Sequence, residues 1–154
     1  MNLLCYRRTT CRLCKSTSLK NVLSLTPTPP ANAFVNKGQL IIEQSIFPLE
    51  LFFCEDCYHL QLLDVVDPNE LFRNYVYVSG TSAIFIKHFE EYAETCIEKF
   101  NLVDGDLVVD IGSNDGTFLK FFKEKNLKVL GIDPAWLIAK EATEKGIETW
   151  PEFF

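Results

Sequence analysis

The chain has 154 residues, 47% of them hydrophobic and thirteen of them phenylalanine, which is enough apolar material for a buried core and argues against general disorder. This length suits one domain or two small ones. The net charge of −6 and the pI near 4.9 leave little basic surface, so nucleic acid is not expected as a partner. No apolar run approaches the roughly 18 residues that a membrane span requires, so no membrane partner is expected either.

The chain contains six cysteines, and their interpretation depends on the cellular compartment. The N-terminal segment carries Arg7, Arg8 and Arg12 but lacks the apolar core of a signal peptide. We therefore expect a cytoplasmic protein, in which cysteines bind metals or stay free thiols more often than they form disulfides.

Four of the cysteines form two Cys-x-x-Cys pairs, Cys11 with Cys14 and Cys54 with Cys57, and thirty-nine residues separate the pairs. A tight turn can direct both sulfurs of a pair at one point, so two pairs can supply the four thiolates of a tetrahedral zinc site. The separation is longer than in short zinc fingers, which requires an inserted loop. The sequence thus predicts one structural zinc ion bound by all four cysteines. Four buried thiols or redox pairs are the alternative.

The insertion between the pairs contains Pro27, Pro29 and Pro30, which exclude a helix and favour an extended segment that crosses the surface. Residues 49–53 are predicted to form a strand that leads into the second cysteine pair, and residues 58–63 the strand that returns from it. The predicted N-terminal domain, residues 1–78, is therefore an α+β zinc-binding domain that contains a zinc-clamped hairpin.

Residues 75–80, with the sequence Tyr-Val-Tyr-Val-Ser-Gly, are expected to be extended, and alternation places Tyr75 and Tyr77 on the same face. Apolar side chains at helical spacing then predict a helix over residues 82–100. Ser79 or Ser82 can cap this helix.

A β-α-β unit is predicted next along the chain. Residues 107–109, Leu-Val-Val, are typical of a strand that is buried on both faces of a parallel sheet. A glycine-containing loop follows at residues 112–116. It leads into a helix over residues 117–125 with an apolar face, and then into a second strand over residues 128–132. Pro134 fits the first turn of a further helix.

Two kinds of nucleotide-type ligand bind at a loop of this position, and the residues distinguish them. A dinucleotide fingerprint requires glycine at its first, third and sixth positions, which here are Gly112, Asn114 and Thr117, so the match fails twice. Asp110, at the end of the first strand, could pair with an ammonium group such as that in the methionine part of S-adenosylmethionine. Asp133, at the end of the second strand, could accept hydrogen bonds from two ribose hydroxyls.

This stretch resembles motifs I and II of the class I S-adenosylmethionine-dependent methyltransferases. The glycine loop with an acid at the end of each strand carries the resemblance, and a purely structural turn is the alternative. The resemblance implies a Rossmann-like α/β methyltransferase domain that begins in residues 79–154. The residues predicted to bind the cofactor are Asp110, Gly112, Ser113, Asn114, Asp115, Gly116, Asp133 and Pro134.

Several motifs of the chain together resemble a single family. They are the two Cys-x-x-Cys pairs, Pro-Pro-Ala-Asn-Ala-Phe at 29–34, Phe-Pro-Leu at 47–49, Gln-Leu at 61–62, Tyr-x-Tyr-x-Ser-Gly at 75–80, Ile-Gly-Ser-Asn-Asp-Gly-Thr at 111–117 and Gly-Ile-Asp-Pro-Ala at 131–135. From Cys11 onward the chain is similar to the zinc-containing sugar C-methyltransferases, which act on nucleotide-linked keto-deoxysugars.

The resemblance implies a zinc domain, a methyltransferase domain and a C-terminal domain. It also implies that a base removes a proton beside the sugar ketone and that the resulting enolate carbon attacks the sulfonium methyl group. The ketone is needed because it acidifies the neighbouring C–H bond and holds the developing negative charge. The family places a tyrosine of the Tyr-x-Tyr-x-Ser motif at the active site. Either Tyr75 or Tyr77 fits this catalytic position, and packing is the alternative role for each.

The family continues beyond the motifs present here, so only the first two strands of the methyltransferase sheet are expected in this chain. The first strand then has a bare apolar edge. We therefore expect the N-terminal portion of such an enzyme, inactive by itself. A methyltransferase of the same build with another small-molecule acceptor and a noncatalytic zinc-binding module are the two alternatives.

Overall fold

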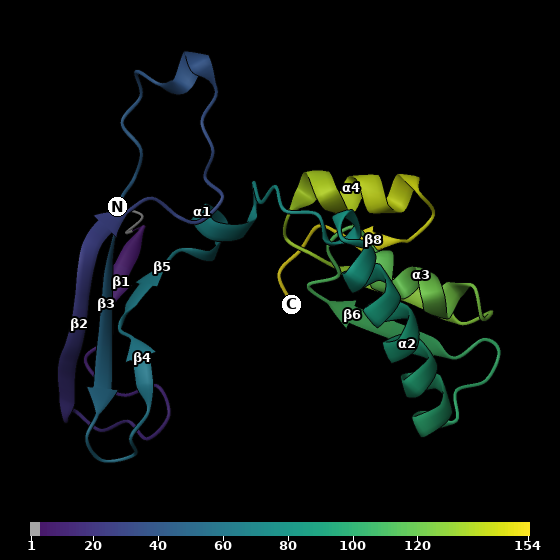
Figure 1. The fold of residues 1–154 in the computed structure, drawn as a ribbon, viewed down its shortest axis with the longest axis horizontal. Helices are drawn as coiled ribbons and strands as arrows, with labels where there is room; N and C mark the ends of the chain where they lie inside the picture. The colour runs from purple at the N-terminus through teal and green to yellow at the C-terminus, as the bar shows by residue number, and fades with distance from the viewer. Residues whose placement is uncertain (1–3) are drawn as a thin grey trace. The chain divides into compact units, whose positions relative to one another are not determined.

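The structure is a computed structural model that describes residues 4–154. The chain divides between Leu71 and Phe72 into two compact units. Figure 1 shows that the N-terminal unit consists mainly of strands, whereas the C-terminal unit combines helices with a sheet.

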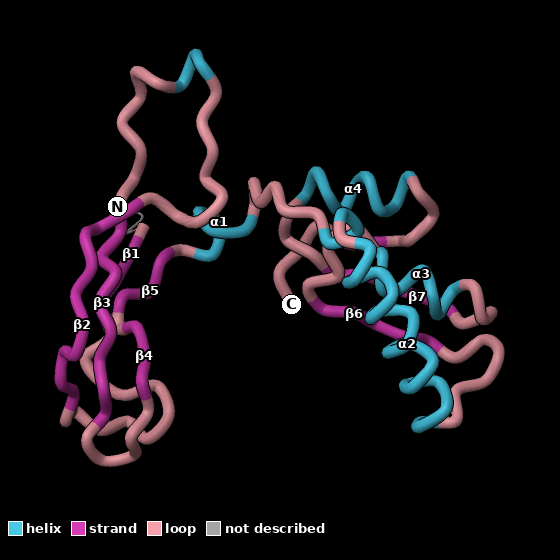
Figure 2. Tube along the Cα trace, in the orientation of Figure 1, coloured by secondary structure: helices cyan, strands magenta, loops and turns pink. Residues whose placement is uncertain are grey.

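The N-terminal unit contains two small antiparallel sheets (Figure 2). In the larger sheet the strand order is β2-β3-β4. The smaller sheet pairs β1 with β5. The strands are β1 (Cys5–Arg7), β2 (Leu19–Thr28), β3 (Phe47–Cys54), β4 (Leu60–Leu62) and β5 (Asp64–Val66).

The predicted zinc-clamped hairpin is present as β3 and β4, but it is extended by β2, a ten-residue strand that the sequence analysis did not assign. Two features hide β2 in the sequence. Its pairing with β3 is irregular between Asn21 and Leu23 and again between Leu25 and Thr28. Nine of its ten residues are exposed, so the strand lacks the alternation of buried and exposed residues that marks a strand with one covered face. The rest of the insertion is a long loop with one 3-10 turn, η1 (Lys37–Gln39).

The C-terminal unit is a mixed α/β structure around a three-stranded parallel sheet with the order β6-β7-β8. Helices connect the parallel strands, as parallel pairing requires. No helix in residues 4–154 is long and apolar enough to cross a membrane. The helices and strands after β5 are α1 (Pro68–Phe72), η2 (Ser79–Thr81), α2 (Ala83–Phe100), β6 (Leu107–Ile111), α3 (Thr117–Lys123), β7 (Lys128–Ile132), α4 (Trp136–Glu144) and β8 (Thr149–Trp150).

The core of this unit lies between the sheet and helices α2 and α3 (Figure 1). Its buried members are Ala93, Leu119, Phe122, Leu127 and Ile147. The strands contribute Val108 and Val129 from the face that points toward these helices. Aromatic rings join the two helices, since Tyr92 of α2 stacks on Phe118 of α3 with ring centroids 5.4 Å apart.

The opposite face of β6 is open, which corrects the expectation that residues 107–109 are buried on both faces. Leu107 is 59% exposed, Val109 45% and Ile111 57%, whereas Val108 between them packs on the core. Within residues 4–154, β6 pairs with β7 alone and forms one edge of the sheet. The sheet also has a third strand, the two-residue β8, where the sequence predicted only a short extended segment.

Candidate metal centre and ligand loop

Both Cys-x-x-Cys pairs form turns of the same construction. In each, the residue after the second cysteine donates its amide to the carbonyl of the first cysteine. These bonds run from Lys15 N to Cys11 O at 3.0 Å and from Tyr58 N to Cys54 O at 2.8 Å. Lys15 has a φ of 68° and Tyr58 a φ of 62°, a left-handed conformation that costs a non-glycine residue about 1–2 kcal/mol. These left-handed positions could not be predicted from the sequence, because neither residue is a glycine.

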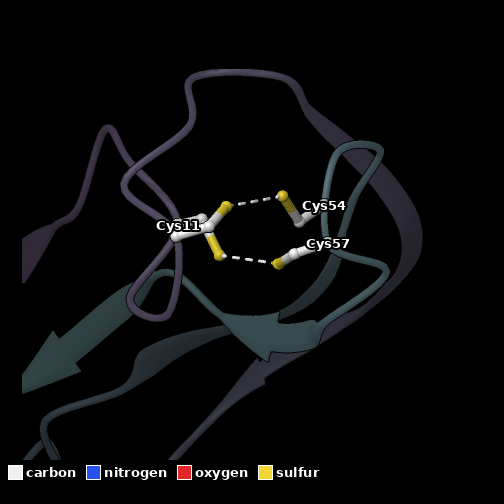
Figure 3. Close-up of side chains that lie close together, drawn as sticks. Cys11, Cys54 and Cys57 are labelled. Atoms are coloured by element: carbon white, nitrogen blue, oxygen red, sulfur yellow. Dashed lines mark hydrogen bonds between the residues drawn. The ribbon is translucent and has the colours of Figure 1, made fainter.

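The two turns bring all four cysteine sulfurs to one place (Figure 3). Cys11 Sγ lies 3.7 Å from Cys57 Sγ, and Cys14 Sγ lies 3.5 Å from Cys54 Sγ. All four atoms lie within 4.8 Å of one another. A zinc ion with bonds of about 2.3 Å to four tetrahedral sulfurs separates those sulfurs by about 3.8 Å. The arrangement therefore fits a zinc ion with little adjustment.

Gln61 supports this cluster from β4 and was not assigned a role by the sequence analysis. The side chain is 4% exposed, its Nε2 lies 3.1 Å from Cys11 Sγ, and its Oε1 accepts the amide of Arg12 at 2.9 Å. A donor to a ligating sulfur both fixes the sulfur and stabilises its negative charge. The signal available in the sequence was a polar residue at an inward position of a short strand between leucines.

The protonation of the cluster favours a divalent cation. Burial raises the pKa of Cys11, but hydrogen bonds from the backbone of Cys14, from Gln61 and from the backbone of Leu13 lower it by more. The resulting pKa is about 5. The pKa of Cys57 is raised to about 12: the backbone of His59 lowers it, whereas burial and the three neighbouring sulfurs raise it by more. The thiolate of Cys11 thus forms readily, and that of Cys57 does not. A bound cation supplies the positive charge that four thiolates together require.

In the C-terminal unit, the two glycines of the loop between β6 and α3 have different surroundings. Both have positive φ, 81° at Gly112 and 75° at Gly116. A Cβ atom at Gly112 would meet nothing within 4 Å, whereas one at Gly116 would lie 2.8 Å from Ile147 Cγ2. Gly112 therefore leaves open space at the end of β6, and Gly116 allows α3 to pack closely against Ile147.

Asp133 fixes the loop to the end of β7. This residue is 7% exposed; its Oδ2 accepts the amide of Asn114 and its Oδ1 the amide of Ala135, each at 2.8 Å. The amide of Gly112 adds a bond of 2.7 Å to the carbonyl of Ile132. Each carboxylate oxygen of Asp133 retains a lone pair for a further donor.

Asp110 lies on β6, half-buried, and has no hydrogen-bond or ion-pair partner among residues 4–154. Burial raises the pKa of this carboxyl group above its ordinary value, and the negative charge of Asp133 raises it further. Two carboxylates at the ends of neighbouring strands, one of them unpaired, make this end of the sheet attractive to a cation.

Close packing beneath the loop explains two further positions of the motif. Ser113 is 5% exposed and its Oγ has no hydrogen-bond partner within residues 4–154. A Cβ atom at Gly131 would overlap Ser113 Oγ and would lie 2.7 Å from Thr149 Oγ1, so only glycine fits there. Pro134 is half-buried and precedes α4, which begins two residues later than proline alone predicted.

The two candidate tyrosines lie on the segment that precedes α2. Their ring centroids are 6.5 Å apart, with Tyr75 half-buried and Tyr77 42% exposed. The side chains of Asn114 and Asp115 bond to the backbone of this same segment, at residues 77–80. The structure therefore brings the tyrosine segment and the glycine loop together.

The geometry defines a protein with four cysteines that can hold a metal ion and a glycine-containing loop at the ends of parallel strands. Comparison with known proteins agrees with it. Residues 11–72 match a family model described as "Putative zinc binding domain". Over 144 residues, 94% of this chain, the sequence is 35% identical to C-methyltransferase NovU of Streptomyces niveus.

The chain is thus similar to a C-methyltransferase over most of its length and matches a zinc-binding domain near its N-terminus, in agreement with the resemblance that its motifs predicted. It spans about a third of the length of the relative, 34% of that protein.

Proposed function

We propose that this chain is the N-terminal portion of an S-adenosylmethionine-dependent C-methyltransferase that acts on a nucleotide-linked keto-deoxysugar. The observation that carries the proposal is the open position at Gly112, at the strand ends that also carry Asp110 and Asp133, in a chain 35% identical to a C-methyltransferase. The parallel order β6-β7-β8 supports an incomplete Rossmann-like domain, in which ligands bind at the carboxyl ends of the strands.

The surroundings of the loop suit S-adenosylmethionine, which would supply an electrophilic methyl group there. Gly112 leaves room for close approach, and the unpaired carboxylate of Asp110 can pair with an ammonium group. Asp133 holds the loop through two backbone amides, and its remaining lone pairs can accept hydrogen bonds from ribose hydroxyls.

The open face and edge of β6 support the incomplete nature of the domain. Its exposed apolar side chains at Leu107, Val109 and Ile111 are typical of a strand that further elements cover. In the complete enzyme we expect strands to pair with this edge and to supply most of the groups that contact the acceptor. This chain alone is accordingly expected to transfer no methyl group.

A tyrosine on the segment before α2 is the residue of this chain that we expect to act on the acceptor. A phenol can hold or move the proton beside the ketone. Tyr77 is the more exposed of the two, and Tyr75 is half-buried beside it. In the complete enzyme, Tyr75→Phe and Tyr77→Phe should separate the roles: the catalytic one should lose about 10²–10⁴-fold in kcat and the other should lose little.

Cofactor binding tests the proposal most directly, with a matched pair of variants in the complete enzyme. Gly112→Val should abolish the binding of S-adenosylmethionine in calorimetry, because its side chain fills the open position. Gly105→Val is the control, since Gly105 also has a positive φ of 88° and open space around it but lies in the turn before β6. Equal affinity in both variants would contradict the cofactor assignment. A complete protein that binds no S-adenosylmethionine at all would favour a zinc-binding module instead.

A further inference from the structure

Two neighbouring side chains of the ligand loop bind the backbone of the tyrosine segment. Asn114 Oδ1 accepts the amide of Ser79 at 2.9 Å, and Asn114 Nδ2 donates to the carbonyl of Tyr77 at 2.9 Å. Asp115 Oδ2 accepts the amide of Gly80 at 3.0 Å. Three hydrogen bonds thus join residues 77–80 to a loop that lies thirty-five residues or more further along the sequence.

The contact is close enough to restrict the residue at position 80. A Cβ atom at Gly80 would lie 2.6 Å from Asp115 Oδ2 and 2.7 Å from Thr117 Oγ1. Asp115 is itself held, because its Oδ1 accepts the amide of Thr117 at 3.2 Å. A side chain at position 80 would therefore displace either the tyrosine segment or the side chains of Asp115 and Thr117.

The loop side of the contact is anchored to the sheet. Asn114 has a left-handed φ of 52°, and its amide donates to Asp133 Oδ2. One carboxylate therefore fixes the backbone of Asn114, and the side chain of Asn114 in turn fixes the backbone on both sides of Val78. The chain of bonds runs from the end of β7, through the loop, to the backbone of Tyr77 and Ser79.

We propose that Asn114 and Asp115 are positioning residues that fasten the tyrosine segment to the ligand loop, so that the position of the tyrosines follows the position of the loop. The proposal rests on the function proposed above for the loop and for the tyrosines. It assigns the side chains of Asn114 and Asp115 to the protein's own backbone and leaves ligand contact to the glycine backbone and the two strand-end carboxylates. A ligand that orders the loop therefore also orders the tyrosine segment, and the coupling acts in both directions.

Amide hydrogen exchange tests the fastening in this chain without any ligand. Asn114→Gly removes the side chain without adding strain, because glycine accepts the left-handed conformation. The amide of Ser79 should then exchange on the order of two- to tenfold faster. Asn101→Gly is the control: Asn101 also has a left-handed φ, 50°, but caps the end of α2. Unchanged exchange at Ser79 in Asn114→Gly, or the same increase in both variants, would overturn the proposal.

Kinetics of the complete enzyme test what the fastening does. In Asn114→Gly the displaced tyrosine should lower kcat by about 10- to 100-fold, and the dissociation constant for S-adenosylmethionine should change much less. Asn114→Asp keeps the acceptor for Ser79 but loses the donor to Tyr77 O, so it should retain part of the activity. Faster exchange with unchanged kcat would overturn the positioning role. A complete enzyme that methylates no nucleotide-linked keto-sugar would refute the proposed function instead, and the exchange result would still decide whether the fastening exists.

Discussion

Substituting alanine at the two loop glycines should separate backbone strain from packing. Either Gly112→Ala or Gly116→Ala places a side chain on a left-handed residue, which costs about 1–2 kcal/mol. At Gly112 the cost ends there, because nothing lies within 4 Å of the new Cβ atom. At Gly116 the new atom also overlaps Ile147, whose Cγ2, Cβ and Cγ1 atoms would lie 2.8, 2.9 and 3.1 Å away.

The overlap at Gly116 should add about 1–3 kcal/mol, because Ile147 is 5% exposed and belongs to the buried core, where overpacking cannot relax into solvent. Gly116→Ala should therefore lower the free energy of unfolding by about 2–5 kcal/mol and Gly112→Ala by about 1–2 kcal/mol. Urea titration followed by tryptophan fluorescence is a suitable assay, since both tryptophans, Trp136 and Trp150, lie in the C-terminal unit.

A double-mutant cycle tests whether Ile147 causes the difference. Ile147→Ala removes the two Cγ atoms of the overlap, so the loss of stability in the double variant should be smaller than the sum of the two single losses. Equal destabilisation by Gly112→Ala and Gly116→Ala, or additivity in the cycle, would refute the packing role of Gly116.

Two further predictions concern the metal and the acids. Elemental analysis should find about one zinc per chain, and Cys54→Ser combined with Cys57→Ser should abolish it, whereas Cys5→Ser, outside the cluster, should retain it. Chelation at neutral pH should unfold the N-terminal unit and leave the tryptophan signal of the other unit in place; zinc retained by the double variant would contradict the assignment. Asp110→Asn should stabilise the ligand-free chain at pH 7 but weaken S-adenosylmethionine binding in the complete enzyme. A variant that binds the cofactor as well as the wild type would exclude a role for this carboxylate.

The sequence predicted the parts of the fold that local chemistry determines. Strand β7 has the predicted bounds, and β6 begins at Leu107 as predicted but continues two residues beyond the apolar run, to Ile111. The four cysteines lie together as predicted, and a short turn constrains each pair. Strand β2 escaped prediction because its pairing with β3, and not its own sequence pattern, holds it in the sheet. The different roles of Gly112 and Gly116 depend on Ile147, which lies thirty-one residues after Gly116. A contact between residues so far apart in the sequence leaves no local pattern from which it could be predicted.

At β6 the sequence pattern and the burial in the structure differ most clearly. An apolar run such as Leu-Val-Val is typical of a strand with both faces covered, and within residues 4–154 only the helix side is covered. The pattern in the sequence therefore fits the strand's surroundings in the proposed complete domain better than its surroundings in this structure.

The ionised carboxylate of Asp110, near that of Asp133, lowers the stability of the folded chain, and a bound cation would remove this destabilisation. Because burial and the charge of Asp133 raise the pKa of Asp110 in the folded chain, the unfolded chain releases this proton at a lower pH. Stability should therefore fall as the pH rises from the unfolded to the folded pKa of Asp110, and the penalty should persist at higher pH. Asp110→Asn should flatten this part of the pH profile. A ligand with an ammonium group favours the ionised carboxylate, so its affinity should rise with pH up to the pKa of Asp110 in the ligand-free folded chain. A pH-independent affinity there would mean that the cation pairs with another group.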